Sequence, residues 1–154
     1  MDATERRALI ERYRVGYNVV VAALEGISEE ELDTRLGPEE WTAREVVHHL
    51  GDSEMRSALR LRQLLAEDGP LIQGYDEHEW ARRLHYDRPI GWSLDAFRAA
   101  RASTSGLLDL MGDSDWKRAG THEESGPYSA EDWLSIYAFH GEDHAEQIRR
   151  ARAG

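Results

Sequence analysis

The chain of 154 residues contains no cysteine. This absence excludes disulfide bonds, thiolate zinc sites and a cysteine nucleophile. Any bound metal must therefore take histidine, aspartate, glutamate or water as ligands, and any thiol chemistry must use a thiol supplied by a substrate or cosubstrate. Long apolar runs are also missing: none approaches the ~20 residues of a membrane span, and the first residues lack the apolar core of a secretory signal. We therefore expect a cytoplasmic protein with no membrane partner.

Basic residues are scarce relative to acidic ones, with 19 lysines and arginines against 30 aspartates and glutamates and a net charge of −11. This excess of negative charge repels nucleic acids and anionic lipids unless a basic patch is segregated. The arginine pairs at 6–7, 82–83 and 149–150 have acidic neighbours within a few residues, which is typical of solvated helix faces. We expect no nucleic-acid partner and a small-molecule substrate.

Helical periodicity is the main pattern in the chain. Apolar residues recur at the spacing of amphipathic helices in four stretches. These stretches cover residues of about 5–24, 42–67, 93–111 and 130–152. We detect no strand pattern and no internal repeat. The sequence therefore predicts an all-α four-helix bundle that forms one domain over residues 1–154.

Local signals mark several helix starts. Ser28 followed by Glu31 predicts a capping box for a short helical turn, and Thr42 followed by Glu45 predicts another for the second long helix. Ser129 is expected to cap the last helix.

The connections between the long helices are unequal. Residues 70–92 form a long crossover connection, which we expect to run from one end of the bundle to the other before the third helix starts at Ser93. Residues 112–128 carry glycine, aspartate, serine and proline, which favour turns.

Two histidines interrupt the apolar face of the last predicted helix. His140 and His144 are four residues apart, in a stripe that includes Tyr137 and Ile148, so both imidazoles lie on the face expected to be buried. Burying neutral imidazoles without partners is costly, which favours a bound metal ion. Buried histidines are often simply hydrogen-bonded core residues, however, so a metal site requires a third ligand.

The second long helix supplies a candidate for that ligand. His49 lies on the same side as the apolar residues Val46 and Leu50 and is expected to point inward, whereas His48 lies toward a more polar flank. His49 is therefore the predicted ligand, and His48 is a boundary residue or a group that supports the site. Bundles build metal sites in this way, from side chains on facing helices.

A di-iron site is the weaker alternative. Glu45 and His48 form a Glu-x-x-His pair, which is half of the motif found in di-iron carboxylate bundles. That motif needs a second copy, and the last predicted helix offers only Glu142-Asp143-His144, in which the spacing is wrong.

Three segments carry a resemblance to a known family. They are Trp41–Met55 (WTAREVVHHLGDSEM), Tyr75–Glu77 with Trp80, and Tyr137–His144 (YAFHGEDH). Together they resemble the DinB-like superfamily, and within it the YfiT branch, whose members are described as metal-dependent hydrolases and as bacillithiol transferases. The resemblance covers nearly the whole chain.

This resemblance implies a four-helix bundle, often a homodimer, that holds one divalent ion with three histidines. Position by position, these ligands are His49, His140 and His144. The chain departs from the branch at three positions where histidine is common: Glu54, Glu142 and Asp143.

Three neutral imidazoles leave a divalent ion its full charge and at least one open coordination position, as in catalytic zinc sites. Such an ion can activate water for hydrolysis or deprotonate a small-molecule thiol. The resemblance favours a transferase that joins a bacillithiol- or mycothiol-like thiol to electrophiles, and a hydrolase is the alternative. Glu54, Asp52 and Gln147 are the candidate acid, base or orienting groups near the open position. Zinc or nickel is the expected metal, and imidazole also accepts iron and manganese.

A non-catalytic bundle braced by the metal is the remaining alternative. In that case the aromatic residues Trp41, Tyr75, Trp80 and Trp133 serve only as packing. An open coordination position beside a cavity favours the enzyme, whereas a closed site favours the brace. Because imidazolium does not bind metal, we also expect metal affinity to fall between about pH 8 and about pH 5.

Overall fold

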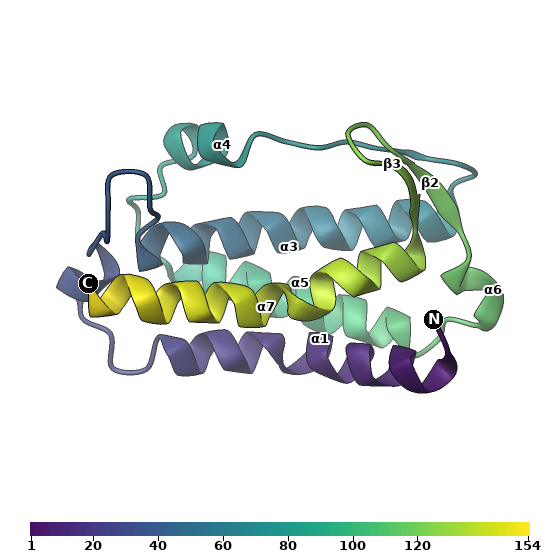
Figure 1. Cartoon of the computed structure of the whole chain (residues 1–154), viewed down its shortest axis with the longest axis horizontal. Coiled ribbons are helices and arrows are strands. Elements are labelled where there is room, and N and C mark those ends of the chain that lie inside the picture. Colours follow the sequence, from purple (N-terminus) through teal and green to yellow (C-terminus); the bar gives the residue numbers. More distant parts are fainter.

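The computed structural model describes residues 1–154 and contains four long helices packed side by side (Figure 1). They are α1 (Ala3–Ala23), α3 (Ala43–Ala66), α5 (Gly91–Leu108) and α7 (Ala130–Ala153). The predicted four-helix bundle is confirmed, and each helix end lies within three residues of its predicted position. None of the helices combines the length and the hydrophobicity that crossing a bilayer demands.

The four helices surround a shared interior. α1 and α7 run in one direction, and α3 and α5 run in the other (Figure 1). α3 packs mainly against α5 and α7, and α1 packs mainly against the same two helices. α3 and α7 are therefore neighbours, which allows side chains from both to meet.

The helix starts follow from the predicted caps. Ser28, Thr42 and Ser129 each accept a hydrogen bond from the backbone three residues on, and the acidic side chain at that position bonds back to the cap. The first of these caps begins the short helix α2 (Glu29–Leu32). The third long helix departs from expectation: α5 begins at Gly91, without a side-chain cap, rather than at Ser93.

The connection between α3 and α5 crosses the length of the bundle, as predicted. It leaves the end of α3, runs along the outside of that helix, forms α4 (Glu77–Arg83) and then enters α5 at the opposite end (Figure 1). Because this connection brings the chain back, α3 and α5 are parallel to each other.

The prediction that the chain has no strands was wrong. Three short strands form one sheet in the order β1-β2-β3, with β1 parallel to β2 and β2 antiparallel to β3. They are β1 (Leu71–Ile72), β2 (Ala119–His122) and β3 (Gly126–Ser129). Residues 112–128 therefore hold a short helix, α6 (Asp113–Trp116), and a hairpin rather than turns alone. Strands of two to four residues are too short to show an alternating pattern, and β1 pairs with residues far along the chain.

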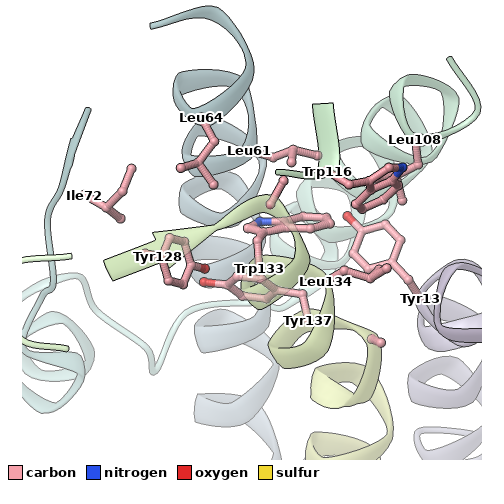
Figure 2. Close-up of a cluster of buried hydrophobic side chains, with 12 residues drawn as sticks. Tyr13, Leu61, Leu64, Ile72, Leu108, Trp116, Tyr128, Trp133, Leu134 and Tyr137 are labelled. Carbon is pink, nitrogen blue, oxygen red and sulfur yellow. The ribbon is translucent and has the colours of Figure 1, made fainter. Parts of the chain in front are cut away.

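The apolar interior consists of two clusters. The first is built around Trp133, whose ring lies 5.3 Å from that of Tyr13 and whose indole nitrogen donates to the Ser57 carbonyl at 2.9 Å (Figure 2). Ile72 of β1 and Tyr128 of β3 belong to this cluster, so the small sheet closes one side of it. The second cluster lies toward the other end of the bundle and includes Val20, Val46, Leu50, Phe97 and Ile148.

A buried polar group connects all four helices. Glu54 of α3 is fully buried and pairs with Arg101 of α5 at 3.0 Å. The Tyr13 hydroxyl of α1 donates to the other Glu54 oxygen at 2.7 Å, and Arg101 also donates to the carbonyls of Tyr13 and Tyr137. Both charges are thus paired and hydrogen-bonded, the condition under which a buried ion pair is tolerated.

α1 and α7 approach each other closely at two glycines. A Cβ on Gly141 would lie 2.9 Å from the Cα and carbonyl oxygen of Gly16, and these are backbone atoms that cannot rotate away. In contrast, a Cβ on Gly106 of α5 would meet nothing within 4 Å.

We expect Gly141→Ala to lower the free energy of unfolding by about 1–3 kcal/mol, because the added methyl group forces two helices apart. Gly106→Ala is the matched control and should raise the stability by about 0.4–1 kcal/mol through its effect on the unfolded chain. Urea unfolding of both variants measures this. Equal effects of the two substitutions would contradict the close approach.

Candidate metal centre

Three histidines from two neighbouring helices converge in the structure. His49 comes from α3, and His140 and His144 come from successive turns of α7. One ligand nitrogen from each residue lies within 4.8 Å of the other two. The ring centroids of His49 and His144 are 4.7 Å apart, and those of His140 and His144 are 4.4 Å apart. The structure thus brings together the three residues that the sequence suggested as ligands.

The environment of these histidines favours the neutral form. Burial lowers the pKa of His49 to about 3, with a further contribution from His144. The pKa of His140 lies well below its ordinary value because of burial and then of the two other histidines and Arg101. Burial also lowers the pKa of His144, although Gln147 and Asp143 act in the opposite direction. Unprotonated imidazole is the form that binds metal ions.

Neighbouring side chains orient two of the three rings. His144 Nδ1 lies 2.8 Å from the Gln147 amide oxygen, which can only accept, so Nδ1 carries the proton and Nε2 keeps a free lone pair. The Ser53 hydroxyl lies 3.1 Å from His140 Nε2. Such outer partners are usual for metal-binding histidines because they fix the ring and its tautomer.

The third ring leaves a polar atom without a partner. His49 is only 1% exposed, and its Nδ1 is buried with no hydrogen bond. An unpaired buried nitrogen beside two other neutral imidazoles is what a metal site requires, and it is otherwise unfavourable. The residues present therefore fit a divalent ion.

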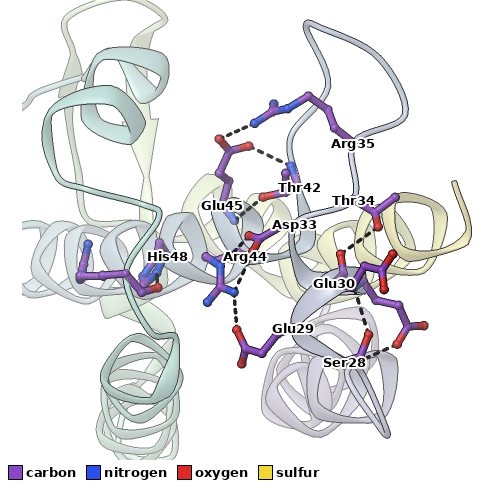
Figure 3. A network of polar contacts seen from close by, with 12 residues as sticks. Ser28, Glu29, Glu30, Asp33, Thr34, Arg35, Thr42, Arg44, Glu45 and His48 are labelled. Atoms are coloured by element: carbon purple, nitrogen blue, oxygen red, sulfur yellow. Dashed lines mark hydrogen bonds and ion pairs between the residues drawn. The ribbon is translucent and has the colours of Figure 1, made fainter.

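The loop before α3 covers one side of the histidines. The Trp41 ring contacts His49 edge-on at 5.0 Å, and the Trp41 indole nitrogen donates to His78 Nδ1 at 3.4 Å. Figure 3 shows how this loop is held: Arg44 bonds Asp33 and Glu29 at 2.7 and 2.6 Å. This network anchors α2 against α3.

A cavity of about 210 Å³ opens beside the histidines. Its lining residues are Glu39, Glu40, Trp41, Glu77, His78, His144 and Gln147. Because His144 contributes to the wall, this cavity borders the histidine cluster on one side. An open side favours a catalytic site over a purely structural one.

The three residues expected near the open coordination position, Gln147, Asp52 and Glu54, have different surroundings in the structure. Gln147 lies beside His144 in the orienting position described above. Asp52 accepts a 2.6 Å hydrogen bond from Tyr86 and thus binds the crossover segment. Glu54 was expected near the open coordination position, but both of its oxygens are engaged by Tyr13 and Arg101 in the core. Glu54 is therefore corrected to a structural residue, because it has no oxygen free for a substrate.

His48 is fully buried but lies outside the histidine cluster. Its Nδ1 is 2.7 Å from the Ser93 hydroxyl, and its Nε2 is 2.8 Å from the Arg88 carbonyl. Both nitrogens are therefore used to link α3 with the start of α5. Ser93, which was expected to start the third long helix, lies inside α5 and serves as this partner.

Two residues near the centre were missed as site residues. Ser53 contacts His140, and Tyr75 of the crossover has a buried hydroxyl with no hydrogen-bond partner. Burial raises the pKa of Tyr75 to about 12, while the neighbouring Ser53 hydroxyl acts to lower it. The helical spacing of Ser53 relative to His49 could have revealed the first, but no local pattern places Tyr75 there.

Fold and site together define a helical bundle with an open three-histidine centre. The chain belongs to the DinB superfamily, whose family model matches residues 12–148. A relative from Oceanobacillus iheyensis, named "putative metal-dependent hydrolase", is 38% identical over 122 residues, which is 79% of this chain and 71% of that protein. A Bacillus mycoides protein with the same description is 30% identical over 135 residues, which is 88% of this chain and 78% of the relative.

A solved structure shows the same architecture. YfiT from Bacillus subtilis superposes with a TM-score of 0.91 and 27% sequence identity, covering 98% of this chain and 87% of YfiT. It is described as "a probable metal-dependent hydrolase with an unusual four-helix bundle topology". The family likeness to YfiT inferred from sequence motifs is thus confirmed.

Metal content tests the ligand set. We expect His49→Ala or His144→Ala to lose most bound metal after dialysis, because each removes one donor from a three-point chelate. His48→Ala should retain the metal, since the His48 nitrogens are bonded to Ser93 and Arg88. Full metal occupancy in His49→Ala, or metal loss only in His48→Ala, would refute this ligand set.

The lowered histidine pKa values should make the free energy of unfolding of the metal-free protein depend on pH. Unfolded histidine titrates near pH 6.5. In the metal-free protein, His49 stays neutral down to about pH 3, so between these values the unfolded chain binds more protons than the folded one. The free energy of unfolding should therefore fall as the pH drops below about 6.5, by up to about 1.4 kcal/mol per pH unit for each such histidine.

Urea unfolding of the metal-free protein at several pH values measures this slope. Metal-free His49→Leu should show a shallower slope, and an identical slope would contradict the lowered pKa. The same pKa values bear on the metal affinity, which was expected to fall between about pH 8 and about pH 5. Because burial lowers the pKa of His49 and His140, protons compete with the metal for these two nitrogens mainly at lower pH.

Proposed function

We propose that this protein is a metal-dependent transferase that joins a low-molecular-weight thiol, bacillithiol- or mycothiol-like, to electrophilic small molecules. One divalent ion, zinc or nickel, would be held by His49, His140 and His144. The observation that carries the proposal is the convergence of three neutral imidazoles beside an open cavity, in a chain without cysteine. The relatives named as metal-dependent hydrolases support metal chemistry. The thiol is supported only by the motif resemblance to the YfiT branch described in the sequence analysis.

When bound, the ion would supply a positive charge that lowers the pKa of a thiol or of water. The protein's own groups prepare the site for it. Gln147 holds His144 in the tautomer that leaves Nε2 free, and Ser53 holds the ring of His140. Trp41 covers His49 and limits water access on that side.

The proposed reaction is a nucleophilic substitution and needs no oxidant or reductant. The thiol sulfur forms a bond to the electrophilic carbon, and the bond from that carbon to its leaving group breaks with its electron pair. The thiol proton must pass to a base. Glu77 lines the cavity beside His144, and burial raises its pKa, so its carboxylate is a suitable acceptor.

A metal-dependent hydrolase is the second candidate function. It is favoured by the descriptions of the relatives and of YfiT. In that reaction the same cavity would hold an ester or amide, and water would replace the thiol. The open cavity supports either reaction over a non-catalytic brace.

We also propose a homodimer in the cytoplasm with no nucleic-acid partner. The YfiT-like resemblance supports the dimer. The net charge of −11 supports the absence of nucleic-acid binding.

A conjugation assay separates the two reactions. The metal-loaded protein should accelerate the reaction of monochlorobimane with one thiol from a panel, relative to the thiol alone, because the centre raises the thiolate fraction. The metal-free protein and His144→Ala should give no acceleration. Thiol-free hydrolysis of esters or amides, without any metal-dependent conjugation, would replace the transferase by the hydrolase. If neither reaction occurs, the non-catalytic bundle is favoured.

A further inference from the structure

A second cavity, of about 310 Å³, lies between the later part of α3 and the crossover segment. Its lining residues are Arg56, Leu59, Arg60, Gln63, Leu71 and Gln73. The lining contains two arginines and two amides but no carboxylate. It therefore differs in charge from the cavity at His144, which is lined by three glutamates.

Neither arginine forms an ion pair with a carboxylate, although Arg60 lies close enough to Glu77 to act on its pKa. Arg56 donates to the carbonyls of Gln73 and Gly74, and Arg60 donates to the Gln73 carbonyl and the Tyr137 hydroxyl. These acceptors hold the crossover against α3, but they are uncharged. In a chain of net charge −11, two adjacent guanidinium groups without a carboxylate partner leave a local positive charge.

Part of the hydrogen-bonding capacity of both arginines is also unused. The Nε atoms of Arg56 and Arg60 are buried and have no partner. A buried donor without an acceptor is unfavourable, and an anion in the cavity would relieve this if the side chains turned toward it. The planar guanidinium group is suited to carboxylates and phosphates because it can donate two parallel hydrogen bonds.

The second cavity is connected to the metal centre through side chains. The Arg56 guanidinium stacks on the Tyr75 ring at 4.6 Å, and the Tyr75 hydroxyl neighbours Ser53, which contacts His140. Arg56 lies seven residues after His49 on the same helix, which corresponds to about 10 Å along the helix axis. Arg56 and the histidines are therefore separated by about the length of a small molecule.

We propose that Arg56 and Arg60 form a binding site for a small dianionic group, a dicarboxylate or a phosphate, carried by the molecule that reacts at the histidine centre. The anion binding needs only the two arginines and the cavity. The link to a reacting molecule rests on the proposed function.

Anion binding can be measured without any reaction. We expect malonate or inorganic phosphate to bind the wild-type protein at low salt in isothermal titration calorimetry. Arg56→Gln should weaken this binding about tenfold or more, because a hydrogen-bonded charge is removed. Arg56→Lys keeps the charge but loses the fork, so its affinity should lie between the two. The tighter of the two probes identifies the anion as carboxylate or phosphate.

Arg62 offers a matched control on the same helix. It donates to Ala58, Ser103 and Thr104, forms no ion pair and does not line the cavity. Arg62→Gln should bind the anion within about twofold of wild type, since only contacts outside the cavity are lost. Absent binding in wild type, or equal weakening in Arg56→Gln and Arg62→Gln, would overturn the proposal.

A second measurement tests the link to the metal centre. With the metal-loaded protein, the dianionic thiol (7-mercaptoheptyl)malonate should give a lower KM than the neutral 8-mercaptooctanol in conjugation to monochlorobimane. Arg56→Gln should remove this difference in KM, whereas the control Arg62→Gln should preserve it. An undiminished difference in Arg56→Gln would refute the link. If neither thiol is accelerated but malonate binding depends on Arg56, the proposed function fails and the anion site stands.

Discussion

The buried ion pair between Glu54 and Arg101 is the interaction on which the rest of the bundle depends. Together with the groups of Tyr13 and Tyr137 it touches every long helix, at a level between the two apolar clusters. Apolar packing tolerates some sliding of helices, whereas a buried ion pair with several hydrogen bonds tolerates little, because losing one partner leaves a charge in a low-dielectric interior. This pair therefore fixes the relative positions of α3 and α7, from which the three histidines converge.

The same pair also controls the charge near the histidines. Arg101 contributes to the lowered pKa of His140, so it disfavours imidazolium at that ring. Glu54 neutralises Arg101 and thus limits the repulsion that a bound cation would experience. This explains why a carboxylate at position 54 is compatible with a metal site even though it contacts no substrate. Its role is to balance an arginine that the fold requires.

The features that depend on a local sequence pattern were predictable from the sequence. Helix starts followed from caps such as Thr42 with Glu45, and the histidine cluster followed from helical spacing and from the family resemblance. The sheet, the role of Glu54 and the place of Tyr75 were not predictable in this way. Glu54 meets Arg101 across 47 residues, and β1 pairs with β2 across a similar distance. No periodicity within one segment encodes such contacts, and a buried acid has the same local signature as a catalytic one.

The two cavities near the metal centre differ in the charge of their lining residues. The cavity at His144 is lined by Glu39, Glu40 and Glu77, whereas the cavity at Arg56 and Arg60 contains only neutral and positive groups. An anionic group is repelled from the first cavity and attracted to the second, and the two effects act in the same direction. On the proposed link between the two sites, a molecule with a reactive end and an anionic end would bind with its reactive end at the histidines. Selectivity for such a molecule would come from Arg56 and Arg60, which lie away from the reacting atoms. The acidic cavity would then remain available for an uncharged or cationic second substrate.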